Sequence, residues 1–217
     1  PFFILAATVM NTGTVTTRIF NFANALVGHL RGGLGHVNVV ASMIFAGMSG
    51  TAVADAAGLG ALEIKAMKEQ GYPLSYSIGI TGASSVIGPI IPPSVAMVVY
   101  GWLGDVSVGA LFIGGVIPGI LLGGCLMAMT WILSFRIPMP IQKRPPMREV
   151  LSLSKQAVLS LLTPLIIVGG IWTGIFTPTE AGVVASTYAI ILVLFIYRDI
   201  GFKELVGVFY KTIEFNS

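Results

Sequence analysis

The stretch HVNVVASMIFAGMSGTAVADAAGLGAL, residues 36–62, decides how the rest of the chain can be arranged. It consists almost entirely of apolar and small residues, so its length alone is compatible with one membrane-spanning helix. Its middle, however, is Gly47-Met48-Ser49-Gly50, where two glycines lower the helix propensity and let the backbone turn. Broken there, the stretch leaves two limbs of ~12 residues, each roughly 18 Å long and so about half a bilayer. These lengths suit a helical hairpin that enters the membrane, turns near the midplane and leaves by the same face.

Residues 36–62 are therefore open to two interpretations, a re-entrant hairpin and a single spanning helix with a flexible middle. Non-helical backbone inside a membrane survives only where protein or a water-filled cavity covers it. Asp55, on the second limb, adds an ionisable group that lipid does not tolerate. Under the hairpin interpretation, the rest of the chain must cover this stretch.

The composition identifies an integral membrane protein. The 217 residues are 55% hydrophobic and 10% charged, with a mean hydropathy of +0.90. No water-soluble fold of this length could bury so much apolar surface. The net charge of +3 comes from scattered basic residues, which gives no support for nucleic-acid binding. Enzyme activity is not expected, because the sequence holds no nucleophile–base pair, phosphate-binding loop or metal-ligand cluster.

The periodicity predicts an all-α, polytopic fold. The expected apolar segments are a partial transmembrane helix over 1–13, the hairpin over 36–62, a broken transmembrane helix over 74–101, and transmembrane helices over 107–134, 156–175 and 180–197. The expected polar segments are an interfacial amphipathic helix over 14–35, a solvated loop over 63–73, a cytoplasmic basic loop over 136–155 and a cytoplasmic interfacial segment over 198–217. The chain starts inside an apolar run without an initiator methionine and stops without a closing element, so we expect it to be truncated.

The segment 74–101 contains a second interruption. Its sequence Gly88-Pro89-Ile90-Ile91-Pro92-Pro93 has three prolines in five residues, which cannot stay in the hydrogen-bonding pattern of an α-helix. We expect the helix to stop near Ile87 and to restart near Ser94. The first half climbs roughly 21 Å, which puts the break at about the depth of the hairpin tip.

The distribution of charge tests this layout. If the hairpin returns to the side from which it came, one compartment receives the segments 14–35, 63–73, 136–155 and 198–217. These segments hold all 12 Lys and Arg residues, whereas the opposite side has Asp105 and Glu180 and no cation. By the positive-inside rule the basic side is cytoplasmic. A straight crossing would move Arg18 and Arg31 outside, so the rule favours the re-entrant hairpin.

Two helix breaks at one depth are the arrangement with which transporters bind ions and anions. The first half of a broken helix offers carbonyls, which suit Na⁺, and the second half offers amides, which suit a carboxylate. Here the free carbonyls come from about 46–49 and 86–93, and Ser49 and Thr51 add hydroxyls. Oxygen ligands of this kind fit a hard cation. The alternative for the small residues is close helix packing, which we favour for Ser84 and Ser85.

Three further polar positions have open or local explanations. Asp55 either tunes the cation site or is satisfied by a Ser, Thr or Asn on a neighbouring helix. Ser94, after the second break, is a second candidate for supporting the site. Thr177-Pro178-Thr179-Glu180 has the T-x-x-E pattern with proline at the first helical position, which predicts a capping box.

Three separated motifs, in order, resemble the large membrane subunit of the TRAP transporters, the tripartite ATP-independent periplasmic permeases. They are GHVNVVASMIFAGMSGTAVADAAGLG (35–60), SSVIGPIIPPSVAMVVYG (84–101) and GIFTPTEAG (174–182). The resemblance covers residues 1–211 and only the first of the family's two inverted repeats, so we expect no transport by this chain alone. It implies an elevator-type, Na⁺-driven symporter of an organic acid, such as a C4-dicarboxylate or a sialic acid, in the bacterial inner membrane. It also implies two partners, a small four-helix membrane subunit and a periplasmic substrate-binding protein.

The resemblance further implies a first sodium site, formed by Ser49 and the carbonyls of Gly88, Ile91 and Pro93. The tip residues Ser49, Gly50 and Thr51 would also face the substrate. Two other hypotheses remain open at this stage: a different hairpin-containing, ion-coupled anion carrier, and a non-transporting structural subunit of a membrane complex.

Overall fold

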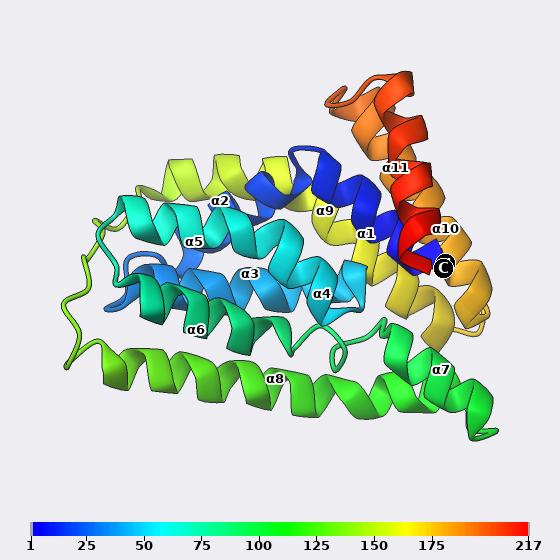
Figure 1. Cartoon of the computed structure of the whole chain (residues 1–217), viewed down its shortest axis with the longest axis horizontal. Coiled ribbons are helices and arrows are strands. Elements are labelled where there is room, and N and C mark those ends of the chain that lie inside the picture. The colour runs from blue at the N-terminus through cyan, green and yellow to red at the C-terminus, as the bar shows by residue number, and fades with distance from the viewer. Residues whose placement is uncertain (1, 217) are drawn as a thin grey trace.

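The computed structural model describes residues 2–216, and within that range the chain is helical with no strand (Figure 1). The predicted all-α, polytopic membrane fold is confirmed. Three helical stretches are long and apolar enough to cross a membrane: α8 (Val108–Leu133), α9 (Met147–Trp172), and α10 (Pro178–Ile191) with its π-helical continuation η2 (Leu192–Ile196).

Residues 33–69 form the hairpin. Its first limb is α3 (Gly33–Ser49), which ends where Gly50 adopts a left-handed conformation with φ of 62°. The chain then returns through three consecutive helical pieces: α4 (Ala52–Ala54), the π-helical segment η1 (Asp55–Leu59) and α5 (Gly60–Glu69). The open ends of α3 and α5 lie at the same end of the molecule (Figure 1). The re-entrant interpretation is therefore confirmed, and the straight crossing is wrong.

The hairpin is longer than the predicted 36–62, and the solvated loop expected over 63–73 is wrong for residues 63–69. These residues continue α5 because six of the seven are Glu, Lys, Ala or Met, which are good helix formers. Lys65 and Glu69 also form an exposed pair one turn apart, with 4.0 Å between charged atoms. Only Gln70–Pro73 connect α5 to the next helix.

The second helix is interrupted as predicted. It consists of α6 (Leu74–Ser85) and α7 (Val95–Leu103), separated by nine non-helical residues, 86–94. The restart is fixed by Ser94, whose hydroxyl accepts a hydrogen bond of 3.2 Å from the amide of Met97. Such side-chain capping supplies a partner for an amide that the helix itself leaves unpaired.

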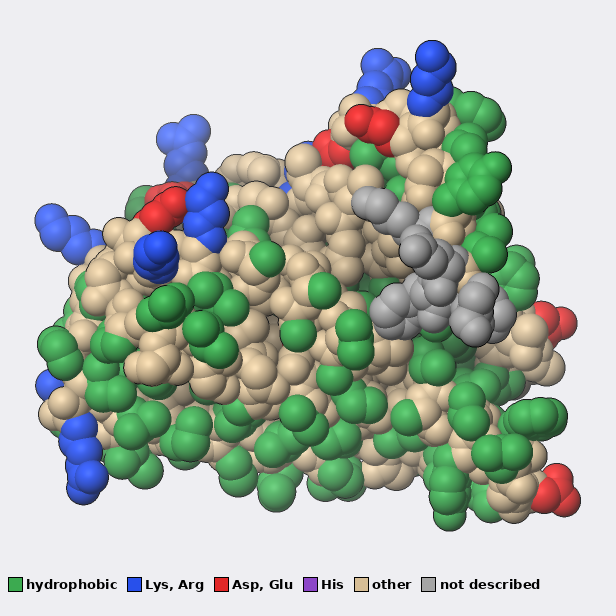
Figure 2. Space-filling model, viewed as in Figure 1, with side chains coloured by type: hydrophobic (Ala, Val, Ile, Leu, Met, Phe, Trp, Pro, Cys, Tyr) green, Lys and Arg blue, Asp and Glu red, His purple; other side chains and the backbone are tan. Residues whose placement is uncertain are grey.

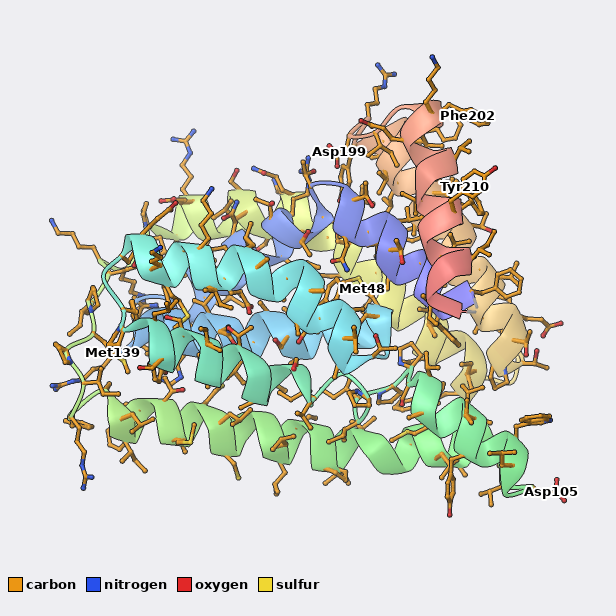
Figure 3. The ribbon with its side chains drawn as sticks, viewed as in Figure 1. Met48, Asp105, Met139, Asp199, Phe202 and Tyr210 are labelled. Carbon is orange, nitrogen blue, oxygen red and sulfur yellow. The ribbon has the colours of Figure 1, made fainter. Side chains whose placement is uncertain are left out.

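Helix α8 lies along one side of the molecule, and the position of the hairpin tip can be compared with its two ends (Figure 1). Asp105 and Met139 mark its two ends, and Met48, next to the hairpin tip, lies between them (Figure 3). The tip therefore lies between the two ends of a helix that is long and apolar enough to cross a membrane.

The remaining helices are α1 (Phe2–Thr12), α2 (Val15–Val27) and α11 (Phe202–Asn216). Helix α1 packs against α10, and α2 packs against α3 and α9. The basic loop predicted over 136–155 is too long, because α9 begins at Met147 and not at residue 156. Pro145 and Pro146 disfavour helix in the residues before them. The residues that follow Pro146 can form a helix.

The molecule has a buried centre and an apolar rim. In α3, large side chains such as Val37, Phe45 and Met48 are fully buried, so other helices cover this limb. On α8, by contrast, large apolar side chains are exposed and make the lower face in Figure 2 mainly apolar. Lys and Arg side chains lie along the left and upper edges of the same view, with some acidic side chains among them, whereas the right and lower right show acidic side chains only.

The T-x-x-E pattern forms the predicted capping box. The hydroxyl of Thr177 accepts a 3.3 Å hydrogen bond from the amide of Glu180. The Glu180 carboxylate in turn accepts a 2.8 Å bond from the amide of Thr177. The motif therefore starts α10, and the structure gives it this local role.

Replacing Thr177 with alanine is expected to lower the midpoint of thermal unfolding by about 2–4 °C, because the first turn of α10 loses its cap. The measurement is a thermal melt of the detergent-purified protein. Thr179→Ala is the matched control, since Thr179 is exposed and lies two residues away. Equal melts for the two variants would contradict a stabilising cap.

Candidate functional site

The hairpin tip and the break between α6 and α7 touch each other. The carbonyl of Gly50 accepts a 3.2 Å hydrogen bond from the amide of Val95. A Cβ on Gly50 would lie 2.4 Å from the carbonyl oxygen of Pro93, and one on Gly88 would lie 2.9 Å from the backbone of Thr51. The two interruptions, far apart in the sequence, therefore share one site.

The tip is shaped by the sequence Gly50-Thr51. Gly50 takes a positive φ that other residues adopt only at a cost, and its amide donates to the carbonyl of Ala46. Thr51 is extended, and its hydroxyl accepts a 3.2 Å bond from the amide of Ala54. The second limb thus starts from a capped N-terminus directly after the first limb ends.

Ser49 is the last residue of α3 and is fully buried. Its hydroxyl has no hydrogen-bond partner among the residues that the structure describes. Leaving a buried hydroxyl unpaired costs about 1–3 kcal/mol. The Ser49 hydroxyl is therefore an available ligand at the tip.

The carbonyls of the break fall into two groups. The carbonyl of Ile87 accepts bonds from the next turn, and that of Pro89 accepts a 2.7 Å bond from the Ser94 hydroxyl. Within residues 2–216, in contrast, no hydrogen bond reaches the carbonyls of Gly88, Ile91 and Pro93. The prolines contribute to this pattern because they have acceptors but no donor. Backbone oxygens without partners suit a cation.

Each predicted site residue can now be located. Ser49 and Gly50 lie at the tip, and Gly88 and Pro93 lie at the break that contacts it. Ile91 belongs to the same break and packs its side chain against Gly119 of α8. Ser94 binds Pro89 and caps α7, so it holds the break in shape. Sodium binding by this set stays a prediction.

A cavity of about 440 Å³ lies beside the tip. Its polar lining comes from Thr51 and from three residues of α1, namely Thr8, Asn11 and Thr12. Asn11 donates a 3.2 Å bond to the carbonyl of Ala54, and its own amide oxygen is buried without a described partner. This wall is not among the predicted site residues, although a polar asparagine in an apolar run is a signal for it in the sequence.

A buried polar network fills the space between the two limbs and α6. Asn38 of α3 binds Glu63 of α5 and Thr81 of α6, at 2.6 and 2.7 Å. Ser84 donates a 2.6 Å bond to Asn38 and receives one of 3.1 Å from Ser42. Ser84 therefore does more than allow close packing, which is the role that we favoured for it.

Asp55 adjoins this network and is 2% exposed. Ser42, on the facing limb, is a neighbour of Asp55, and its hydroxyl donates a 3.1 Å hydrogen bond to Ser84. One of the Asp55 carboxylate oxygens, Oδ1, has no partner among the described residues. Both roles predicted for Asp55, tuning the cation site and pairing with a Ser, Thr or Asn of a neighbouring helix, therefore stay predictions.

Overall, a re-entrant hairpin that meets a broken helix inside an apolar layer defines the class of membrane transporters with discontinuous helices. The chain belongs to the DctM component family of the tripartite ATP-independent periplasmic transporters, whose family model matches residues 1–216. The resemblance to the TRAP large subunit is thereby confirmed.

Curated relatives agree with this family. The chain is 49% identical over 94% of its length to the sialic acid TRAP transporter permease protein SiaT of Haemophilus influenzae. It is 46% identical over 99% of its length to the sialic acid TRAP transporter large permease protein SiaM of Vibrio cholerae. It is 45% identical over 94% of its length to the C4-dicarboxylate TRAP transporter large permease protein DctM of Pseudomonas aeruginosa. The chain spans 33%, 50% and 48% of these relatives, respectively.

Gly50→Ala is expected to destabilise the protein by more than about 1 kcal/mol, because the left-handed conformation disfavours a Cβ. The added carbon would also meet the Pro93 carbonyl and separate the tip from the break. Thermal unfolding in detergent measures the effect. Gly79→Ala is the control, since a Cβ there meets nothing within 4 Å and alanine favours the helix. Equal stability of the two variants would show that the contact between tip and break is unimportant.

Proposed function

We propose that this chain is part of a permease that imports an organic acid together with Na⁺. The observation that carries the proposal is the buried, unpaired hydroxyl of Ser49. It lies at a tip that contacts the break with the free carbonyls of Gly88, Ile91 and Pro93. These neutral oxygens are of the kind that hard cations prefer, and a set without a charged ligand suits a monovalent ion.

The substrate would bind on the other side of the same tip. Thr51 and the start of the second limb border the 440 Å³ cavity. A helix N-terminus carries a partial positive charge, which favours a carboxylate. The relatives named above are for sialic acid and C4-dicarboxylates, and a further relative, 40% identical, is named for 2,3-diketo-L-gulonate. All are organic acids, which fits a carboxylate-binding tip.

One short segment would then serve both ligands. Na⁺ would bind at the C-terminal end of α3 through Ser49, and the carboxylate would bind at Thr51, two residues further on. An ion that orders the tip would therefore also order the amides that receive the substrate. This is a coupling free energy in the ordinary sense, because each ligand favours the same tip conformation.

The family suggests the setting in which this coupling operates. We infer an elevator movement in the bacterial inner membrane, a small membrane subunit and a periplasmic substrate-binding protein as partners. The exposed apolar face of α8 and the segregation of basic residues support a multi-pass location with the basic side in the cytoplasm (Figure 2). The relatives are about two to three times as long as the matched segment, so transport is a property to test in the whole permease.

Ser49→Ala is expected to raise the Na⁺ concentration for half-maximal uptake about tenfold, which corresponds to about 1.4 kcal/mol for one lost ligand. The measurement is Na⁺-dependent uptake of a labelled organic acid by the whole permease with its partners in proteoliposomes. Ser85→Ala is the matched control, because Ser85 adjoins the break but donates locally to Gly82. An unchanged Na⁺ dependence in Ser49→Ala would reject the site.

Asp55→Ala is expected to reduce uptake far more than the amount of protein in the membrane, because a nearby negative charge favours the bound cation. Quantitative immunoblots of the same membranes supply the comparison. Equal losses of uptake and protein in Asp55→Ala would instead support a structural role. Uptake driven by a proton gradient without Na⁺ would favour another ion-coupled carrier.

A further inference from the structure

Glu63 is a carboxyl group that the proposed sodium site does not use. It lies on α5, faces the space between α3 and α6, and is 1% exposed. One oxygen, Oε2, accepts a 2.6 Å hydrogen bond from the side-chain amide of Asn38. The other oxygen, Oε1, is buried and has no hydrogen-bond partner among the described residues.

No described cation compensates this carboxyl. Lys65 and Lys68 share its helix but are on the exposed side. The titratable groups on the packed elements are His36 of α3, Tyr76 of α6 and Asp55 of η1. The His36 ring is engaged with the Arg31 carbonyl, and the Tyr76 hydroxyl donates to Thr130. The remaining group, Asp55, has the same sign of charge as Glu63.

Two buried carboxyls therefore face a hairpin interior in which the structure describes no positive charge. The cost of an isolated buried charge is large unless it is paired or neutralised. A monovalent ion at the hairpin tip would compensate one of these groups, and Asp55 is the one nearer the tip in sequence. Glu63, eight residues further along the same limb, would still need one positive charge.

The surroundings of Glu63 favour a proton over a second metal ion. A hard cation needs several oxygen acceptors around it. Asn38, however, presents amide hydrogens to Glu63 and to Thr81, and its own oxygen already accepts from Ser84. The nearest polar neighbour is thus a donor, which would repel a metal. A proton on Oε1 removes the charge and leaves one unpaired O–H group, which costs far less than an isolated buried carboxylate.

We propose that Glu63 is a proton-binding site of the hairpin, with the proton on Oε1, so that the hairpin holds a neutral acid at this position. A hydrogen-bonded series runs from this group through Asn38 and Ser84 to Ser42, which is a neighbour of Asp55 on the facing limb. Protonation of Glu63 would therefore act on the carboxyl near the tip. The proposal goes beyond sodium coupling, and the choice of Glu63 over Asp55 rests on the proposed sodium site, because the ion compensates Asp55.

The test is infrared spectroscopy of the purified whole permease, which detects the carbonyl stretch of a neutral carboxylic acid. Wild-type protein at neutral pH is expected to show this band, and Glu63→Gln is expected to lose it. Glu69→Gln is the matched control, because it alters an exposed carboxyl on the same helix and should leave the band unchanged. Glu63→Met, also uncharged, replaces Glu63→Gln if that variant does not fold.

Three results would overturn the proposal. A neutral-acid carbonyl band of equal intensity in wild-type protein and the Glu63 variant would mean that Glu63 is ionised. Loss of the band in Asp55→Asn but not in the Glu63 variant would move the proton to Asp55. Disappearance of the wild-type band on adding NaCl at constant pH would make Glu63 a sodium ligand. Because the readout needs no transport, it is independent of the uptake experiment with Ser49→Ala.

Discussion

The structure depends on one constraint, that backbone polar groups in an apolar layer must find partners or be covered by protein. Helices satisfy the constraint within themselves, but residues 50–51 and 86–94 do not. The fold brings these two non-helical segments into contact, and the Gly50 carbonyl accepts a hydrogen bond from the Val95 amide. After this pairing, the oxygens without a described hydrogen-bond partner are the Ser49 hydroxyl and the carbonyls of Gly88, Ile91 and Pro93. The candidate site therefore consists of neutral oxygen ligands.

Close approach makes this pairing possible. Gly50 and Gly88 lie where a Cβ would collide with the opposite backbone. The site is therefore a contact between two main chains, and few side chains take part. Ser49 is the exception, since its hydroxyl is buried among the backbone groups without a described partner. A backbone-lined site changes little when neighbouring side chains vary, which fits relatives named for several different acids.

The interruptions could be predicted from sequence because glycine and proline act locally. Gly47–Gly50 and Pro89–Pro93 disturb a helix whatever surrounds them, so their positions and their matched depth followed from residue type and helical rise. Glu63 could not be found in this way. Its neighbours Lys65, Lys68 and Glu69 are exposed, and only the packing of α6 against α5 buries it. The α1 side of the cavity was missed for the same reason, since Asn11 reaches Ala54 only in the folded chain.

The π-helical segment η1 determines the angle between Asp55 and Glu63 around the axis of the second limb. Within it, the amide of Gly60 binds the carbonyl of Asp55, five residues back, so this turn holds one residue more than an α-helical turn. In a regular α-helix, residues eight apart would diverge by about 80° around the axis, but with one residue absorbed the divergence falls to about 20°. Asp55 and Glu63 therefore lie along one line of the limb. Deletion of one residue within 56–59 would restore the ordinary winding and rotate one of the two acids out of the interior.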